Sequence, residues 1–168
     1  MPHDRLLRTI ERRFTDFCAS YRGLTNEELL EPGVTGQWSV RDLIAHVTWW
    51  EEEFLKHAPT ILAGERTERY STLYGGIDAF NALMTRQRAH FTLPEVLRQQ
   101  AEVHAKLVTY VAALPAEEIA SGTRLRRRLS LDTYGHYPLH TGQILAWRER
   151  TGRAAPSVDQ PELFPKPT

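Results

Sequence analysis

The stretch of sequence that decides the fold is residues 39–54, SVRDLIAHVTWWEEEF. Ser39 followed three residues later by Asp42 is a variant of the capping box that begins many helices. Apolar side chains then recur every three or four residues, the period of one helix face. They are Val40, Leu43, Val47, Trp50 and Phe54. Since Pro59 limits the far end, the stretch predicts one long amphipathic helix whose apolar face needs partners.

The same period extends over most of the chain on either side of this stretch. Before it, apolar residues at spacings of three and four predict a long helix over about 7–24. After it, we expect a shorter helix over about 77–91 and a longer one over about 92–113. A last helix is predicted over roughly 133–151, where Pro138 should kink the helix or delay its start.

Four long helices and a shorter fifth predict an all-α protein, a four-helix bundle with an extra short helix. A length of 168 residues suits one domain. We expect the bundle to occupy residues 1–153, with a long connection over 115–131. Residues 154–168 hold four prolines and are expected to form a tail without fixed secondary structure.

Composition excludes several functional classes. Lys plus Arg and Asp plus Glu both number 21, so the formal net charge is zero, which argues against a nucleic-acid-binding protein. No apolar run approaches the length of a membrane span, and the N-terminus lacks the apolar segment of a secretory signal. The single cysteine, Cys18, allows no internal disulfide. We therefore expect a cytoplasmic protein that binds neither membranes nor nucleic acid.

Histidines supply the first candidates for a site. His136 and His140 are four residues apart, which places both rings on one helix face, and such a pair is typical of metal sites and of ordinary surface positions alike. His46 lies at the border of the buried face of the helix over 39–54. It is either a core-edge histidine with one hydrogen bond or the third ligand of an open site, with Glu53 or Asp42 orienting a ligand ring.

Several stretches also carry a family resemblance. Residues 37–51, QWSVRDLIAHVTWWE, resemble the second-helix signature of the DinB/YfiT-like superfamily. Residues 136–144, HYPLHTGQI, resemble its last-helix signature, in which two histidines are followed by Gly-Gln. The segments 76–81, 93–104 and 132–137 are most similar to the ClbS/DfsB branch of that superfamily.

The resemblance spans roughly residues 5–150 and implies a four-helix bundle that is often a dimer. It also implies a divalent metal, zinc or nickel, held by His46, His136 and His140. Known members include thiol-dependent transferases and isomerases, so a low-molecular-weight thiol is a second expected cofactor. The ClbS branch, by contrast, is associated with cyclopropane hydrolysis that needs no such metal. This chain departs from the ClbS type by keeping all three histidines, and from the commonest last helix by placing Pro138 between two of them.

Three functions remain open at this point. The first is a metal-dependent enzyme that acts on a small organic or electrophilic molecule by thiol transfer or hydrolysis. In that enzyme Trp50, Gln143 and Trp147 are expected to bind the substrate or cofactor, since Gln143 and Trp147 lie within about 40° of the face of the histidine pair.

The second function is a ClbS/DfsB-like hydrolase that opens reactive electrophiles without a metal, with Glu53, His104 and Tyr134 as acid–base candidates. The third is a non-enzymatic binding bundle with a role in stress. In any of these, the arginines at 124 and 126–128 either steer an anionic substrate or lie in a solvated loop.

A last expectation concerns assembly. Trp49 and Leu6 fall outside the best-populated apolar faces of their helices, which predicts that they are exposed. Exposed apolar side chains of this size usually belong to an interface. We therefore expect a homodimer formed through helix faces.

Overall fold

A computed structural model describes residues 2–156 of the chain. Eight helices account for most of these residues, and they contain no β-strand, so the all-α prediction is confirmed. The helices are α1 (Pro2–Ser20), α2 (Asn26–Leu30), α3 (Val40–Leu62), α4 (Tyr70–Leu73), α5 (Ile77–Arg88), α6 (Leu93–Ala113), α7 (Arg124–Asp132) and α8 (Tyr137–Arg150).

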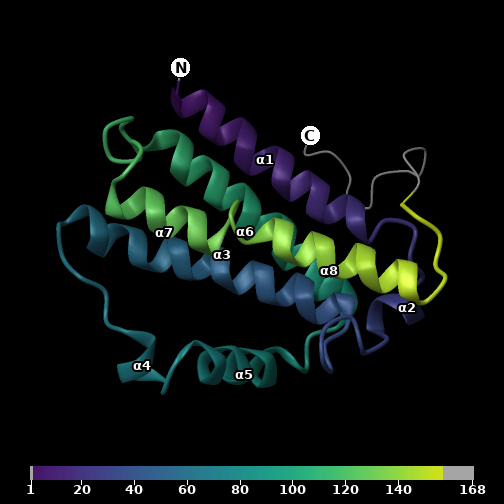
Figure 1. The fold of residues 1–168 in the computed structure, drawn as a ribbon. Coiled ribbons are helices and arrows are strands. Elements are labelled where there is room, and N and C mark those ends of the chain that lie inside the picture. The colour runs from purple at the N-terminus through teal and green to yellow at the C-terminus, as the bar shows by residue number, and fades with distance from the viewer. Residues whose placement is uncertain (1, 157–168) are drawn as a thin grey trace.

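The bundle has four long helical segments, and the fourth segment consists of two successive helices, α7 and α8. Helices α1, α3 and α6 lie side by side, and α7 and α8 follow each other along the fourth edge (Figure 1). Helix α3 contacts α6, α7, α8 and α5, which makes it the central element. The short helices α4 and α5 lie outside the bundle along α3 (Figure 1). The predicted four-helix bundle with an extra helix is therefore the observed architecture.

Helix α3 begins where the sequence predicts. The Ser39 backbone N–H donates to Asp42 Oδ2 at 3.0 Å, and the Asp42 backbone N–H donates to Ser39 Oγ at 3.2 Å. This capping box satisfies two donors that the helix itself leaves unpaired. The predicted apolar face is buried in the core, and Pro59 lies in the last turn before the helix ends at Leu62.

The C-terminal third of the chain differs from its prediction. Residues 124–132 form helix α7, whereas we expected a connection over 115–131. The last helix starts at Tyr137, not near 133, because Pro138 occupies its first turn, where the missing N–H costs no hydrogen bond. Asp132 is the last residue of α7. The predicted delay of the start by Pro138 is confirmed.

The expectation that Trp49 and Leu6 are exposed is wrong. Their exposed fractions are only 1% and 2% within the single chain, because loops and α5 cover sides of the bundle that the helical period leaves open. Trp49, for example, packs against Trp38, with 6.2 Å between ring centroids. The homodimer stays a prediction, and these two side chains no longer argue for it.

Two further expectations concern the C-terminal tail and membrane-spanning helices. Most of the predicted tail, from residue 157 onward, lies outside the described residues. Among the helices that the structure describes, none is long and apolar enough to cross a membrane.

Candidate metal centre

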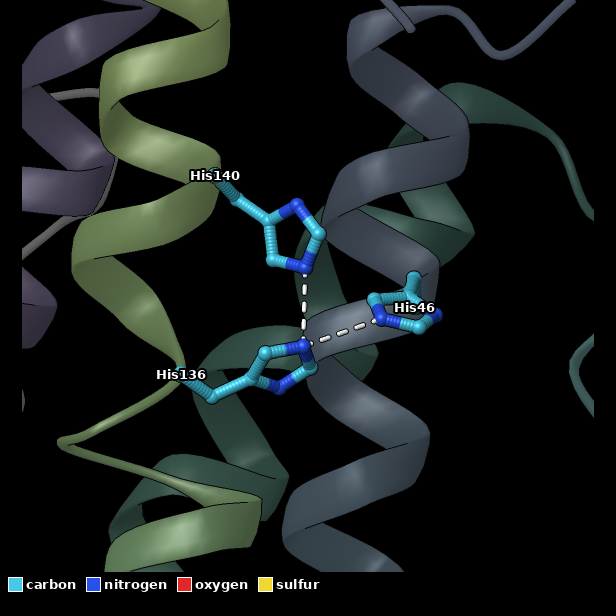
Figure 2. A group of neighbouring side chains, drawn as sticks. All are labelled: His46, His136 and His140. Carbon is cyan, nitrogen blue, oxygen red and sulfur yellow. Dashed lines mark hydrogen bonds between the residues drawn. The ribbon is translucent and has the colours of Figure 1, made fainter. Parts of the chain in front are cut away.

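Three histidine rings meet between α3 and the start of α8. His46 comes from α3, His136 is the residue before α8, and His140 is in its first turn (Figure 2). The Nε2 atom of His136 lies 3.1 Å from Nε2 of His46 and 2.8 Å from Nε2 of His140. One ring nitrogen from each residue lies within 4.8 Å of the other two.

This nitrogen cluster suits a cation better than it suits hydrogen bonding. A neutral ring nitrogen carries either one proton or one lone pair, so Nε2 of His136 cannot pair well with both of its neighbours. Zinc–nitrogen bonds of about 2.1 Å at tetrahedral angles separate ligand nitrogens by about 3.4 Å. A small outward movement of the rings therefore makes room for an ion on three imidazoles.

Burial keeps all three rings uncharged at neutral pH. Removal from water lowers the pKa of His46 far below its usual value, and the nearby His140 and His136 lower it further. Burial, followed by repulsion from His140, lowers the pKa of His136 to about 3. Burial also lowers the pKa of His140, although its contact with Gln143 opposes the shift. Neutral imidazole is the form that binds metals.

Each ring is positioned by its own surroundings. The His140 Nδ1–H donates to Gln143 Oε1 at 2.7 Å, which leaves the Nε2 lone pair directed at the other two histidines. His46 is packed between Trp38 and Trp49, with 4.8 Å from its ring centroid to each of theirs. Gln143, which we expected to contact a cofactor, therefore orients a candidate ligand.

A pocket of about 310 Å³ opens beside His46 and His136. Its apolar walls are Trp50, Ile77 and Leu131, and its polar walls are Tyr70, Asn81, Arg128 and Asp132. This volume is at the lower end of the range for small-molecule sites, about 300–1,000 Å³. The histidine cluster is thus reachable by a small ligand.

The polar wall is a chain of hydrogen bonds. Arg128 Nε donates to Asp132 Oδ2 at 2.5 Å, and Arg128 Nη2 donates to the Tyr70 hydroxyl at 2.8 Å. That hydroxyl in turn donates to Glu53 Oε2 at 2.5 Å. Burial raises the pKa of Asp132 to about 7, against the opposing effect of the Arg128 guanidinium. Asp132 is therefore a carboxyl group able to exchange a proton near neutral pH.

The sequence does not predict this wall, because the expected connection over 115–131 places Arg128 outside any helix, whereas Arg128 and Asp132 share α7. The signal was the spacing of four between the two residues, which allows an ion pair on one helix face. Of the arginines at 124 and 126–128, only Arg128 lines the pocket. Arg124 instead donates to the backbone carbonyl of Gly64 at 3.1 Å.

The three residues expected to act as acids or bases do not come together. Glu53 lies behind Tyr70 and also contacts Lys56 and His57. His104 is in the core, and Tyr134 accepts a hydrogen bond from Arg126 Nε at 2.7 Å. They therefore do not form one catalytic group.

The remaining expected side chains also have separate places. Asp42 is occupied by the cap of α3, so neither it nor Glu53 orients a ligand ring. Trp50 lines the pocket, but Trp147 is 1% exposed and packs in the core, with the Arg153 guanidinium 4.1 Å from its ring centroid. Burial raises the pKa of the Cys18 thiol to about 12, so this cysteine is unreactive.

Comparison with known proteins gives the same fold. One solved structure, described as "Sibling Lethal Factor Precursor - DfsB", is 13% identical with a TM-score of 0.73, covering 90% of this chain and 98% of that one. A second, an uncharacterised protein from Escherichia coli UTI89, is 14% identical with a TM-score of 0.74, covering 90% and 95%. None of the curated proteins matches the sequence. A family model of the DinB superfamily matches residues 9–149, and the chain therefore belongs to that superfamily.

Proposed function

We propose that this protein is a metal-dependent enzyme that acts on a small organic or electrophilic molecule in the pocket beside the three histidines. The observation that carries the proposal is the convergence of three neutral ring nitrogens, within 4.8 Å of one another, next to a cavity of about 310 Å³. Three protein ligands and an adjacent opening are the features of a catalytic metal site, whereas a structural site is closed by a fourth ligand.

His46, His136 and His140 would hold a zinc or nickel ion. When bound, such an ion lowers the pKa of a coordinated water or thiol so that its anion exists near neutral pH. Gln143 keeps His140 in the tautomer that can bind the ion, because the Nδ1 proton is held by the amide oxygen at 2.7 Å.

Asp132 is the residue best placed to move a proton in this pocket. Its carboxyl group has a pKa of about 7, so it can accept a proton from the attacking nucleophile and return one to the leaving group. Arg128 fixes its orientation through the 2.5 Å bond to Oδ2. Hydrolysis and thiol transfer would use the same residues and differ only in the nucleophile, which is water or a low-molecular-weight thiol.

A metal-independent hydrolase is the second candidate. It is supported by the fact that Asp132 and Arg128 line the pocket whether or not the histidines bind an ion. In that case Nε2 of His136 shares a hydrogen bond with one of its two neighbours, at 3.1 Å from His46 and 2.8 Å from His140, and the carboxyl group alone performs acid–base chemistry. The cytoplasm is the compartment we propose for either enzyme, since its one thiol is buried and unpaired.

The test uses two probe reactions with protein that carries no His-tag: conjugation of cysteine to monochlorobimane, and hydrolysis of p-nitrophenyl acetate. We expect zinc- or nickel-loaded protein to accelerate one of them, and chelation or His140→Ala to remove the acceleration. Activity that survives both treatments but is lost in Asp132→Asn would favour the metal-independent hydrolase. Absence of both activities in the loaded protein would contradict the proposal for these two reaction classes.

A further inference from the structure

Two large apolar side chains at the mouth of the pocket are exposed to water. Ile77, at the start of α5, has an exposed fraction of 55%, and Leu131, near the end of α7, has one of 73%. They come from different elements and line the same cavity. Leu139 on α8 is similarly exposed at 57% but is not among the residues that line it.

The inner apolar wall is held rigidly. The Trp50 ring is 8% exposed and meets Phe80 of α5 edge-on, with 5.4 Å between ring centroids. It also meets His136 edge-on at 6.2 Å, which joins the apolar wall directly to the histidine cluster. A ligand in this pocket that reaches the histidines would therefore contact Trp50, with Ile77 and Leu131 as the more exposed apolar walls.

Among the described residues, the pocket lining offers no free positive charge. Arg128 is the one Lys or Arg side chain in its lining, and it is already paired with Asp132 and with the Tyr70 hydroxyl. A carboxylate or phosphate on the ligand would have to compete with Asp132 for this guanidinium. Such competition disfavours anionic ligands away from the histidines.

One buried acceptor in the lining has no partner. Asn81 Oδ1 is inaccessible to solvent and accepts no hydrogen bond from the residues that the structure describes. An unpaired buried acceptor costs free energy, which a ligand N–H or O–H group would recover once a rotation of the Asn81 side chain turned the oxygen into the cavity.

From these observations we infer that the pocket binds uncharged, mainly apolar molecules whose polar end reaches the histidines and which carry a hydroxyl or amide donor for Asn81. The inference rests on the proposed function for the position of that polar end. The apolar body contacts Trp50, Ile77 and Leu131, and its outer part covers the two exposed side chains. Its recognition is hydrophobic, so affinity grows with apolar length until the chain passes Leu131.

Alkyl hydroxamates test this inference, because they combine a metal-binding head, an N–H donor and an apolar chain of adjustable length. Calorimetry with zinc-loaded protein would compare acetohydroxamate, butyrohydroxamate and hexanohydroxamate. Each added methylene should tighten binding by up to about fourfold, the equivalent of ~0.8 kcal/mol. Ile77→Ser and Leu131→Ser should flatten this dependence, whereas the matched control Leu139→Ser should leave it unchanged. A dependence that is flat in the unaltered protein, or equally steep in all three variants, overturns the inference while leaving the metal proposal intact.

A metal-free arm separates this inference from the proposed function. If the protein binds no zinc, ligand-observed NMR with hexanamide, butanamide and hexanoate still tests the apolar wall. Tighter binding of hexanamide than of butanamide or hexanoate supports the inference, and preference for hexanoate overturns it. Light scattering tests the alternative that a second copy of the chain occupies this surface. A dimer that dissociates in Leu131→Ser would show that a second copy, not a ligand, covers Ile77 and Leu131.

Discussion

Two clusters that contain histidine lie close together along α3 and differ in the partners of their ring nitrogens. Around His46 the partners are other histidines, and the ring nitrogens point at one another beside an open pocket. Around Glu51, five residues further on, His104 Nδ1–H donates to Glu51 Oε1 at 2.9 Å, and the Tyr137 hydroxyl donates to the same atom at 2.5 Å.

The difference teaches that a histidine packed among other side chains does not by itself mark a functional site. His104 is stacked on Phe14, with 3.4 Å between ring centroids, and its donor is used by a carboxylate that is 0% exposed. The other carboxylate oxygen, Glu51 Oε2, is buried without a hydrogen-bond partner among the described residues, but Glu51 does not line the pocket beside His46. At His46 and His136, by contrast, the Nδ1 atoms are buried without a hydrogen-bond partner among the described residues, and the Nε2 atoms crowd together. The first group stabilises the bundle, and the second is suited to a cation.

The largest expected effect tests the structural group. His104→Ala removes one of the two donors to the buried Glu51 carboxylate, and we expect the free energy of unfolding to fall by about 3 kcal/mol. Urea denaturation followed by circular dichroism measures it. The exposed His90 provides the matched control, since His90→Ala should change stability by less than about 0.5 kcal/mol. Equal effects of the two substitutions would contradict the assignment of His104 to the core.

The next effect concerns pH. The pKa of Asp132 is about 7 in the folded protein and near 3.8 when unfolded, so between these values the folded state holds a proton that the unfolded state has lost. The contribution of Asp132 to the free energy of unfolding is therefore fully present below about pH 4. It declines as the pH rises towards 7, by at most about 1.4 kcal/mol per pH unit. Asp132→Asn should remove this decline, which unfolding experiments at pH 5, 6 and 7 would detect. A decline of the same slope in the variant would assign it to another group.

Gln143 should have a moderate effect that is confined to the metal site. Without its amide oxygen the His140 ring is no longer held in one tautomer, and we expect Gln143→Ala to weaken zinc binding by about 10- to 100-fold. Competition with a chromogenic chelator measures the affinity. Gln87, an exposed residue of α5, gives the matched control Gln87→Ala. Unaltered zinc affinity in Gln143→Ala would show that the hydrogen bond to His140 has no part in binding.

The smallest effect separates Tyr134 from both groups. Tyr134→Phe removes the acceptor of one hydrogen bond from Arg126, so we expect a loss of about 1 kcal/mol in stability and unchanged zinc affinity. Thermal denaturation and the same chelator competition provide the two readouts. A large loss of zinc affinity in this variant would show that Tyr134 contributes to the metal site.

The sequence predicts the helices of the bundle better than it predicts the residues that line the site. Ser39 and Asp42 predict the start of α3 because capping depends on neighbouring residues. The apolar face of α3 is predictable because its apolar residues recur with the period of a helix. The residues alone leave open whether His46 joins the histidine pair, and the family resemblance favours the three-histidine site, since nothing local in the chain shows that α8 faces α3.

The missed features depend on contacts between distant segments. Helix α7 buries only two leucines, Leu125 and Leu129, too few for an obvious apolar face in an arginine-rich stretch. The burial of Trp49 depends on Trp38 in the preceding loop, and the pKa of Asp132 depends on its burial in the folded chain. None of these is visible in a helical period.

Elemental analysis tests most directly whether the His46 group, unlike the His104 group, binds a metal. The protein would be purified without a His-tag, dialysed against zinc or nickel, and analysed together with His140→Ala and His57→Ala. His57 is the matched control because it lies on α3 with His46 but contacts Glu53 instead of the cluster. We predict about one ion per chain in the unaltered protein and in His57→Ala, and little in His140→Ala. Substoichiometric metal in the unaltered protein, or equal metal in both variants, would contradict the account.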